Sequence, residues 1–164
     1  CISKMSLRDN IEEQIKCLGI TNSQLSEVNL YSYETILRKI WNSFTKLGHK
    51  AEEHSWINHH IENYVSYLPD SEKDVTNLLK IIIPENEKYW FIGMETKNEK
   101  PKYWLYEGTL NSILQILDNM YLFDFYIVDK KYKWLLSEEQ HGALVVSGEP
   151  VASNLLRYQS SLNL

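Results

Sequence analysis

Apolar and aromatic positions between residues 121 and 148 fall into three short runs separated by polar turns. The runs cover residues 123–128, 132–136 and 143–147, and β-branched or aromatic side chains dominate them. Short runs of this kind, divided by charged and glycine-containing turns, are typical of consecutive antiparallel strands. We therefore predict a three-stranded meander as the structural centre of the chain.

The residues before and after the meander predict two more strands and two helices. Aromatic runs at 88–95 and 102–107, with a polar loop between them, indicate a β-hairpin. Residues 109–117 carry Leu and Ile at helical spacing behind Thr109, which is a suitable N-cap. Pro150 marks the start of a terminal helix, because proline is tolerated at the first helical position.

The first part of the chain has the periodicity of helices. Apolar residues recur every three or four positions in 6–18 and 32–46, and a glycine follows each segment. A further helix is predicted over 71–82, between two prolines. Residues 21–28 are expected to be a short connector.

Residues 52–68 allow two interpretations. Trp56, His60 and Tyr64 recur at four-residue steps, which favours a helix. The sequence Tyr64, Val65, Ser66, Tyr67 also suits a strand, because aromatic and β-branched residues are enriched in strands. We predict a helix that ends at Pro69.

The order of these elements predicts a single α+β domain over residues 1–164. It consists of a mainly antiparallel five-stranded sheet with packed helices and a helical N-terminal half. Residues 1–5 are expected to be left over from processing or from an expression vector, because Met5 looks like a natural start. The side chains expected in the core are Cys17, Trp41, Phe123, Phe125, Ile127, Leu136 and Val145.

Charge and motif content narrow the classes of function. The 164 residues carry 17 basic and 22 acidic side chains, a formal net charge of −5. This balance disfavours nucleic acid as a ligand and suits a basic protein partner. No apolar run approaches the roughly 20 residues that cross a bilayer. No phosphate loop, nucleophile elbow or Cys-x-x-Cys pair occurs, so we expect a cytoplasmic protein without a cofactor or membrane contact.

Histidines provide two candidate sites. His54, His59 and His60 lack the i, i+4 spacing that places two imidazoles on one helical face, so no metal site is predicted. His141 lies close to Glu138 and Glu139, and a carboxylate beside an imidazole is a weak candidate for an acid/base pair. A small enzyme that uses these residues is therefore an alternative function.

Acidic and aromatic side chains around the meander indicate a binding surface. Tyrosine and tryptophan are enriched in protein interfaces, and carboxylates complement a basic partner. The predicted function is a non-catalytic protein-binding module, and a homodimeric structural protein is a further alternative. The residues predicted for this surface are Tyr132, Trp134, Glu138, Glu139, His141 and Glu149.

The C-terminal half resembles a group of small bacterial proteins of unknown function. Such proteins are similar in size and acidity to the immunity proteins of bacterial toxin systems. The resemblance implies a protein that neutralises a basic toxin, and by itself it implies no active-site residues. It is carried by Trp90, Trp104, Tyr106, Glu107, Tyr126, Ile127, Val128, Trp134, Leu135, Leu136, Glu138, His141, Gly142 and Gly148.

Overall fold

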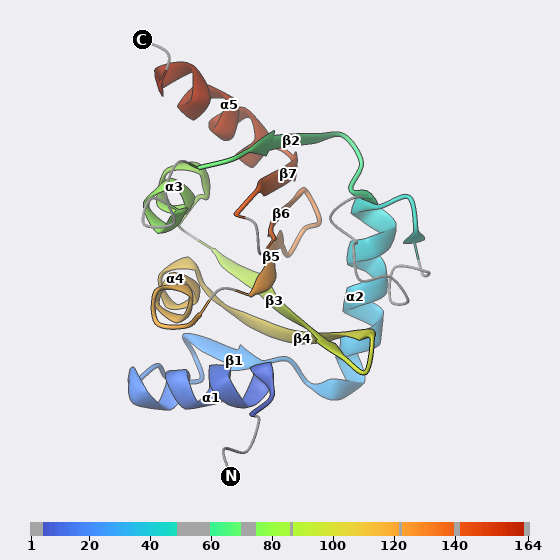
Figure 1. The fold of residues 1–164 in the computed structure, drawn as a ribbon, viewed down its shortest axis with the longest axis vertical. Coiled ribbons are helices and arrows are strands. Elements are labelled where there is room, and N and C mark those ends of the chain that lie inside the picture. The colour runs from blue at the N-terminus through green and yellow to red at the C-terminus, as the bar shows by residue number, and fades with distance from the viewer. Residues whose placement is uncertain are drawn as a thin grey trace.

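The computed structural model of the chain describes residues 5–48, 60–69, 75–85, 87–121, 123–139 and 142–162. These residues form five helices and seven strands (Figure 1). In chain order they are α1 (Leu7–Cys17), β1 (Leu25–Glu27), α2 (Leu30–Phe44), β2 (Tyr64–Tyr67), α3 (Val75–Ile82), β3 (Lys88–Lys97), β4 (Lys100–Thr109), α4 (Leu110–Asp118), β5 (Asp124–Asp129), β6 (Trp134–Glu138), β7 (Leu144–Gly148) and α5 (Val151–Leu162).

All seven described strands form one antiparallel sheet in the order β1-β4-β3-β5-β6-β7-β2. The predicted hairpin and meander are present as β3–β4 and β5–β6–β7. The prediction of five strands and of a helical N-terminal half is wrong, because β1 and β2 come from the first 67 residues and form the two outer strands. β1 has only three residues, too few for an alternating pattern to be recognised.

The predicted helix over 52–68 is also wrong in its described part. Residues 64–67 form β2, which pairs with β7, whereas residues 49–59 lie outside the described residues. Val65 and Tyr67 are half-buried, while Tyr64 and Ser66 are exposed. This alternation is the period-two burial of a strand whose partner lies about eighty residues away in the sequence.

Helices cover both faces of the sheet and create two hydrophobic cores. Helices α1, α3, α4 and α5 pack on one face, which contains Phe91, Ile127 and Trp134. Helix α2 packs on the other face (Figure 1), where Trp41 contacts the rings of Tyr103 and Tyr126 at centroid distances of 5.3 Å. The expected burial of Trp41 is confirmed.

Local sequence signals explain where two helices begin. Ser6 accepts a hydrogen bond from the Asp9 N–H, and Asp9 reciprocates, so the pair forms a capping box for α1. Thr109 caps α4 as expected. Cys17, in contrast, is exposed, because it lies off the stripe of Leu7, Ile11 and Ile15 that α1 buries.

Candidate protein-binding edge

The sheet ends in two outer strands, β1 and β2, and their free edges differ. An outer strand presents main-chain N–H and C=O groups that another chain can pair with. The direction of these groups in β2 follows from the β6–β7 turn, where the Glu139 N–H donates to the Ala143 carbonyl oxygen at 3.3 Å. Main-chain groups alternate sides along a strand. The odd-numbered residues of β7 therefore bond to β6, and its even-numbered residues bond to β2.

β2 thus exposes the main-chain groups of Tyr64 and Ser66. Val65 and Tyr67 are the register partners of even-numbered residues in β7, so their N–H and C=O groups point into the sheet. Those of the two intervening residues point away from it. The side chain of Gln159 in α5 supports this assignment, because its Nε2 donates to the Ser66 carbonyl oxygen at 3.2 Å.

Helix α5 extends beyond this edge (Figure 1). Val151, Leu155, Tyr158 and Leu162 follow each other at steps of four, three and four and share one helical face. Val151 and Leu155 are fully buried, and Tyr158 stacks edge-on against Tyr67 of β2 at 5.8 Å. Leu162 is 54% exposed. The apolar stripe of α5 therefore continues past the last strand of the sheet.

The dimensions of this overhang match one additional strand. Leu162 lies four residues beyond Tyr158, which is about 6 Å further along the helix. A strand added to β2 would lie about 4.8 Å beyond it. An eighth strand at the edge would therefore run beneath Leu162.

The side chains of the β2 edge are apolar or uncharged. Residues 63–68 contain no charged residue, and two of the exposed large apolar side chains, Tyr64 (57% exposed) and Leu68 (65% exposed), belong to this segment. Lysine, proline and bulges normally protect an outer strand from pairing. No residue of β2 is a lysine or a proline.

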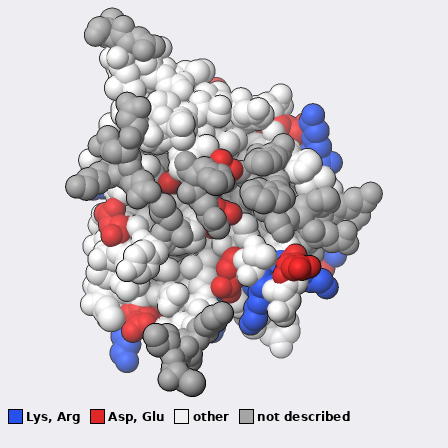
Figure 2. Space-filling view, viewed as in Figure 1, with Lys and Arg blue, Asp and Glu red and all other residues white. Residues whose placement is uncertain are grey.

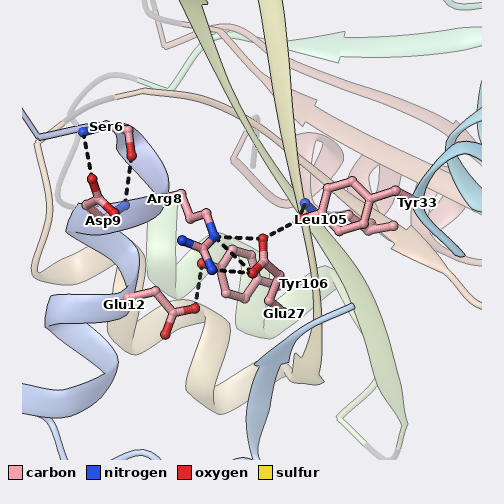
Figure 3. Close-up of polar contacts among 8 residues, drawn as sticks. All are labelled: Ser6, Arg8, Asp9, Glu12, Glu27, Tyr33, Leu105 and Tyr106. Carbon is pink, nitrogen blue, oxygen red and sulfur yellow. Dashed lines mark hydrogen bonds and ion pairs between the residues drawn. The ribbon is translucent and has the colours of Figure 1, made fainter. Parts of the chain in front are cut away.

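The β1 edge is closed by its own contacts. The Leu25 N–H, which would point outward, donates to the Thr21 carbonyl oxygen at 3.1 Å. The Glu27 carboxylate accepts hydrogen bonds from Arg8 Nε at 2.9 and 3.0 Å and from the Tyr33 hydroxyl at 2.5 Å (Figure 3). The Tyr33 oxygen in turn accepts the Leu105 N–H at 3.0 Å. This network ties α1, β1, α2 and β4 together and leaves little of β1 for a partner.

Two tyrosines of this network are held protonated. Burial, and then the hydrogen bond to Glu27, raise the pKa of Tyr33 well above its ordinary value. Burial also raises the pKa of Tyr106, whose hydroxyl donates to Glu12 at 2.9 Å. A protonated phenol is the donor that each carboxylate requires, so the network is structural at neutral pH.

Those predicted binding residues that the structure describes do not form one surface. Tyr132 and Glu149 lie near the start of β6, since Trp134 pairs with Gly148. Glu139 follows the other end of β6. The first and last residues of this strand are about 13 Å apart at the usual rise per residue. His141 lies outside the described residues.

Two of these predicted residues are buried in the sheet. Trp134 is 2% exposed and packs against Tyr89 at a ring-centroid distance of 5.1 Å. Glu138 is 4% exposed. Because alternate residues of a strand share a face, both lie on the same side as Leu136, which is a core residue. Neither side chain is available on the surface that we predicted.

The two candidates near the start of β6, the half-buried Tyr132 and the exposed Glu149, have local structural contacts. Tyr132 stacks on Trp90 at 5.0 Å, and the Lys39 ammonium lies 4.4 Å from the Tyr132 ring centroid. Glu149 accepts the Ser153 N–H at 3.2 Å, in the first turn of α5. These contacts position a turn and a helix.

Other kinds of site have less support among the described residues. No three His, Cys, Asp or Glu side chains converge there as metal ligands. None of the described helices is long and apolar enough to cross a membrane. A surface hollow of about 280 Å³ lies between α3 and the start of α4, lined by Lys80, Glu85, Thr109, Leu110, Asn111 and Leu114. The Thr109 hydroxyl there is bonded to Ser112 and caps α4.

Charge on the visible face of the molecule is consistent with its acidic composition. Figure 2 shows Asp and Glu side chains spread over this face, whereas Lys and Arg lie mainly at its margin. The formal net charge of the whole chain is −5.

The described fold is therefore an α+β protein with a helix-covered antiparallel sheet and one open edge. The chain belongs to the family described as "Family of unknown function (DUF6756)", whose model matches residues 3–159. The expected resemblance to uncharacterised proteins is confirmed at this level. No curated protein and no solved structure is detectably similar to the chain.

Proposed function

We propose that this protein is a non-catalytic binding module that recruits a basic protein by adding one of its strands to β2. The observation that carries this proposal is the pair of outward main-chain units at Tyr64 and Ser66 beneath the overhang of α5. Strand addition at an exposed edge is an established mode of peptide recognition, in which main-chain hydrogen bonds supply affinity and neighbouring side chains supply specificity.

The acidic character of the chain favours a basic partner. Opposite charge accelerates the encounter of two proteins, whereas apolar contacts at the centre of the interface supply most of the affinity. Tyr64, Leu68 and Leu162 are exposed apolar side chains around the edge. Neutralisation of a basic toxin, as in immunity proteins, is the specific form of this function that the sequence resemblance suggests.

Selection from a random peptide library displayed on phage tests the proposal. Wild-type protein is the target, and Ser66→Pro is the counter-target, because proline removes the outward N–H that an added strand needs. Ser66→Ala is the matched control, since it keeps that N–H. Strand addition predicts peptides rich in β-branched residues and in Lys or Arg that bind the wild type and Ser66→Ala but not Ser66→Pro. Equal recovery on all three proteins would exclude β2 as the binding edge.

The toxin-neutralising form has a separate test. The protein is co-expressed with the product of the adjacent gene, and growth is compared for wild type, Ser66→Ala and Ser66→Pro. Wild type and Ser66→Ala are expected to protect growth, whereas Ser66→Pro is not. If the protein neither binds that gene product nor protects growth against it, the toxin-neutralising form is ruled out. Peptide recognition at β2 would then still be tested by the library selection.

A further inference from the structure

We infer that the partner segment lies in a slot between the β2 edge and the overhang of α5, and that Gln159 holds the place of the partner's main chain in the free protein. This inference rests on the proposed function and adds the position and chemistry of the occupant. The slot has a main-chain wall, at Tyr64 and Ser66, and an apolar roof, at Leu162.

Gln159 occupies one of the acceptors that an added strand would use. Its Nε2 donates to the Ser66 carbonyl oxygen at 3.2 Å in an exposed contact. A side-chain amide carries the same N–H donor as a peptide group, so the partner's N–H replaces it without leaving the oxygen unpaired. Release of the glutamine is a modest cost, because an exposed hydrogen bond contributes little net free energy.

The roof of the slot selects the side chains of the partner segment. Alternate residues of an added strand would point toward α5, on the face where Tyr158 stacks against Tyr67. The partner residue beneath Leu162 is therefore apolar, because Leu162 is 54% exposed and an apolar contact would remove its apolar surface from water. The intervening residues face the other side, where Tyr64 is exposed.

Charge favours a basic segment over a second copy of this chain. Each copy has a net charge of −5, and the exposed Glu62 precedes the strand. Pairing β2 with β2 of a second copy would bring like charges together, and like charges across an interface are unfavourable. Lys or Arg beside the apolar positions of a partner segment would instead complement Glu62.

The experiment uses the tightest peptide recovered from the phage library, labelled with a fluorophore, and measures its binding by fluorescence anisotropy. Gln159→Ala is expected to tighten binding by about two- to five-fold, because the competing hydrogen bond is lost. Leu162→Ser is expected to weaken binding by about five- to thirty-fold, because the apolar contact is lost. Leu30→Ser, which changes an exposed leucine at the start of α2, is the matched control and should leave binding unchanged.

The outcomes separate this inference from the function on which it rests. Peptide binding that is lost in Ser66→Pro but unchanged in Gln159→Ala and Leu162→Ser would overturn the slot and retain strand addition. Failure of every peptide to bind wild-type protein better than Ser66→Pro would overturn both. Sedimentation of the wild type as a dimer that becomes monomeric in Ser66→Pro would identify a second copy as the occupant and contradict the basic segment.

Discussion

The Gln159 side chain in α5 donates a hydrogen bond to the Ser66 main-chain oxygen at the outer edge of the sheet. The side-chain amide of Gln159 in α5 thus occupies part of the β2 edge. Among the described residues, this is the sheet edge that the chain's own contacts leave largely open. The opposite edge at β1 is instead closed by a turn and by the contacts of Glu27. The two edges of one sheet therefore differ: contacts within the chain close β1, whereas β2 presents outward main-chain groups.

Proline substitutions at neighbouring positions of β2 should have unequal effects on stability. Ser66→Pro removes an outward N–H and should cost about 1 kcal/mol, since an edge strand tolerates proline there. Val65→Pro removes an N–H bonded to β7 and should cost about 3 kcal/mol or more. Urea denaturation followed by circular dichroism measures both. Equal losses would contradict the assigned directions of the main-chain groups.

Tyr33→Phe should destabilise the fold by about 1–2 kcal/mol, because it leaves the Glu27 carboxylate and the Leu105 N–H without the phenol oxygen. Tyr31→Phe is the matched control, since Tyr31 is 95% exposed. Thermal unfolding of the three proteins measures the difference. A Tyr33→Phe variant as stable as the control would show that the network does not hold β1.

Stability should decrease in alkaline solution as buried tyrosines ionise. Burial, with a smaller contribution from the charges of Glu87 and Asp129, raises the pKa of Tyr89 from 10.0 to about 12. A folded-state pKa above the unfolded value means that the stabilising contribution is complete below pH 10 and is lost as the pH rises toward 12. Tyr33 and Tyr106 act in the same direction.

Ultraviolet titration of the phenols, combined with circular dichroism, measures this effect. The same titration of the protein unfolded in urea provides the reference. Buried tyrosines should ionise only as the fold is lost. Ionisation of all tyrosines in one step near pH 10, with the fold intact, would contradict the burial described for Tyr33, Tyr89 and Tyr106.

Gly148→Ala should be far more destabilising than Gly19→Ala. Both glycines have positive φ, 99° and 68°, which costs an alanine about 1 kcal/mol. A Cβ at Gly148 would also lie 2.0 Å from the Lys133 carbonyl oxygen, whereas nothing lies within 4 Å of one at Gly19. Gly148→Ala should therefore lose more than about 3 kcal/mol in chemical denaturation. Similar losses for both variants would mean that β6 and β7 are not so close at this point.

The strands and helices with strong local signals could be predicted from the sequence. Aromatic and β-branched runs identified β3 to β7, and caps such as Thr109 identified helix starts. β2 could not be predicted in the same way, because Tyr64 continues a helical spacing from Trp56 and His60. Its pairing with β7 depends on residues about eighty positions away, which a local pattern does not contain.

The burial of two of the predicted binding residues could have been anticipated from the sequence. Leu136 was expected in the core, and the two-residue period places Trp134 and Glu138 on its face. Their burial therefore follows from the strand prediction itself. The open edge at β2 could be recognised only from the structure, because it depends on the order of strands in the sheet and on where α5 ends relative to β2.

Amide hydrogen exchange measured residue by residue by NMR tests the central claim most directly. In the free protein, the Tyr64 and Ser66 N–H groups should exchange quickly, while those of Val65 and Tyr67 are protected by β7. After addition of the peptide selected from the library, Tyr64 and Ser66 should become protected. Protection that instead appears around Tyr132 and Glu149, with Tyr64 and Ser66 still exchanging quickly, would contradict recognition at β2.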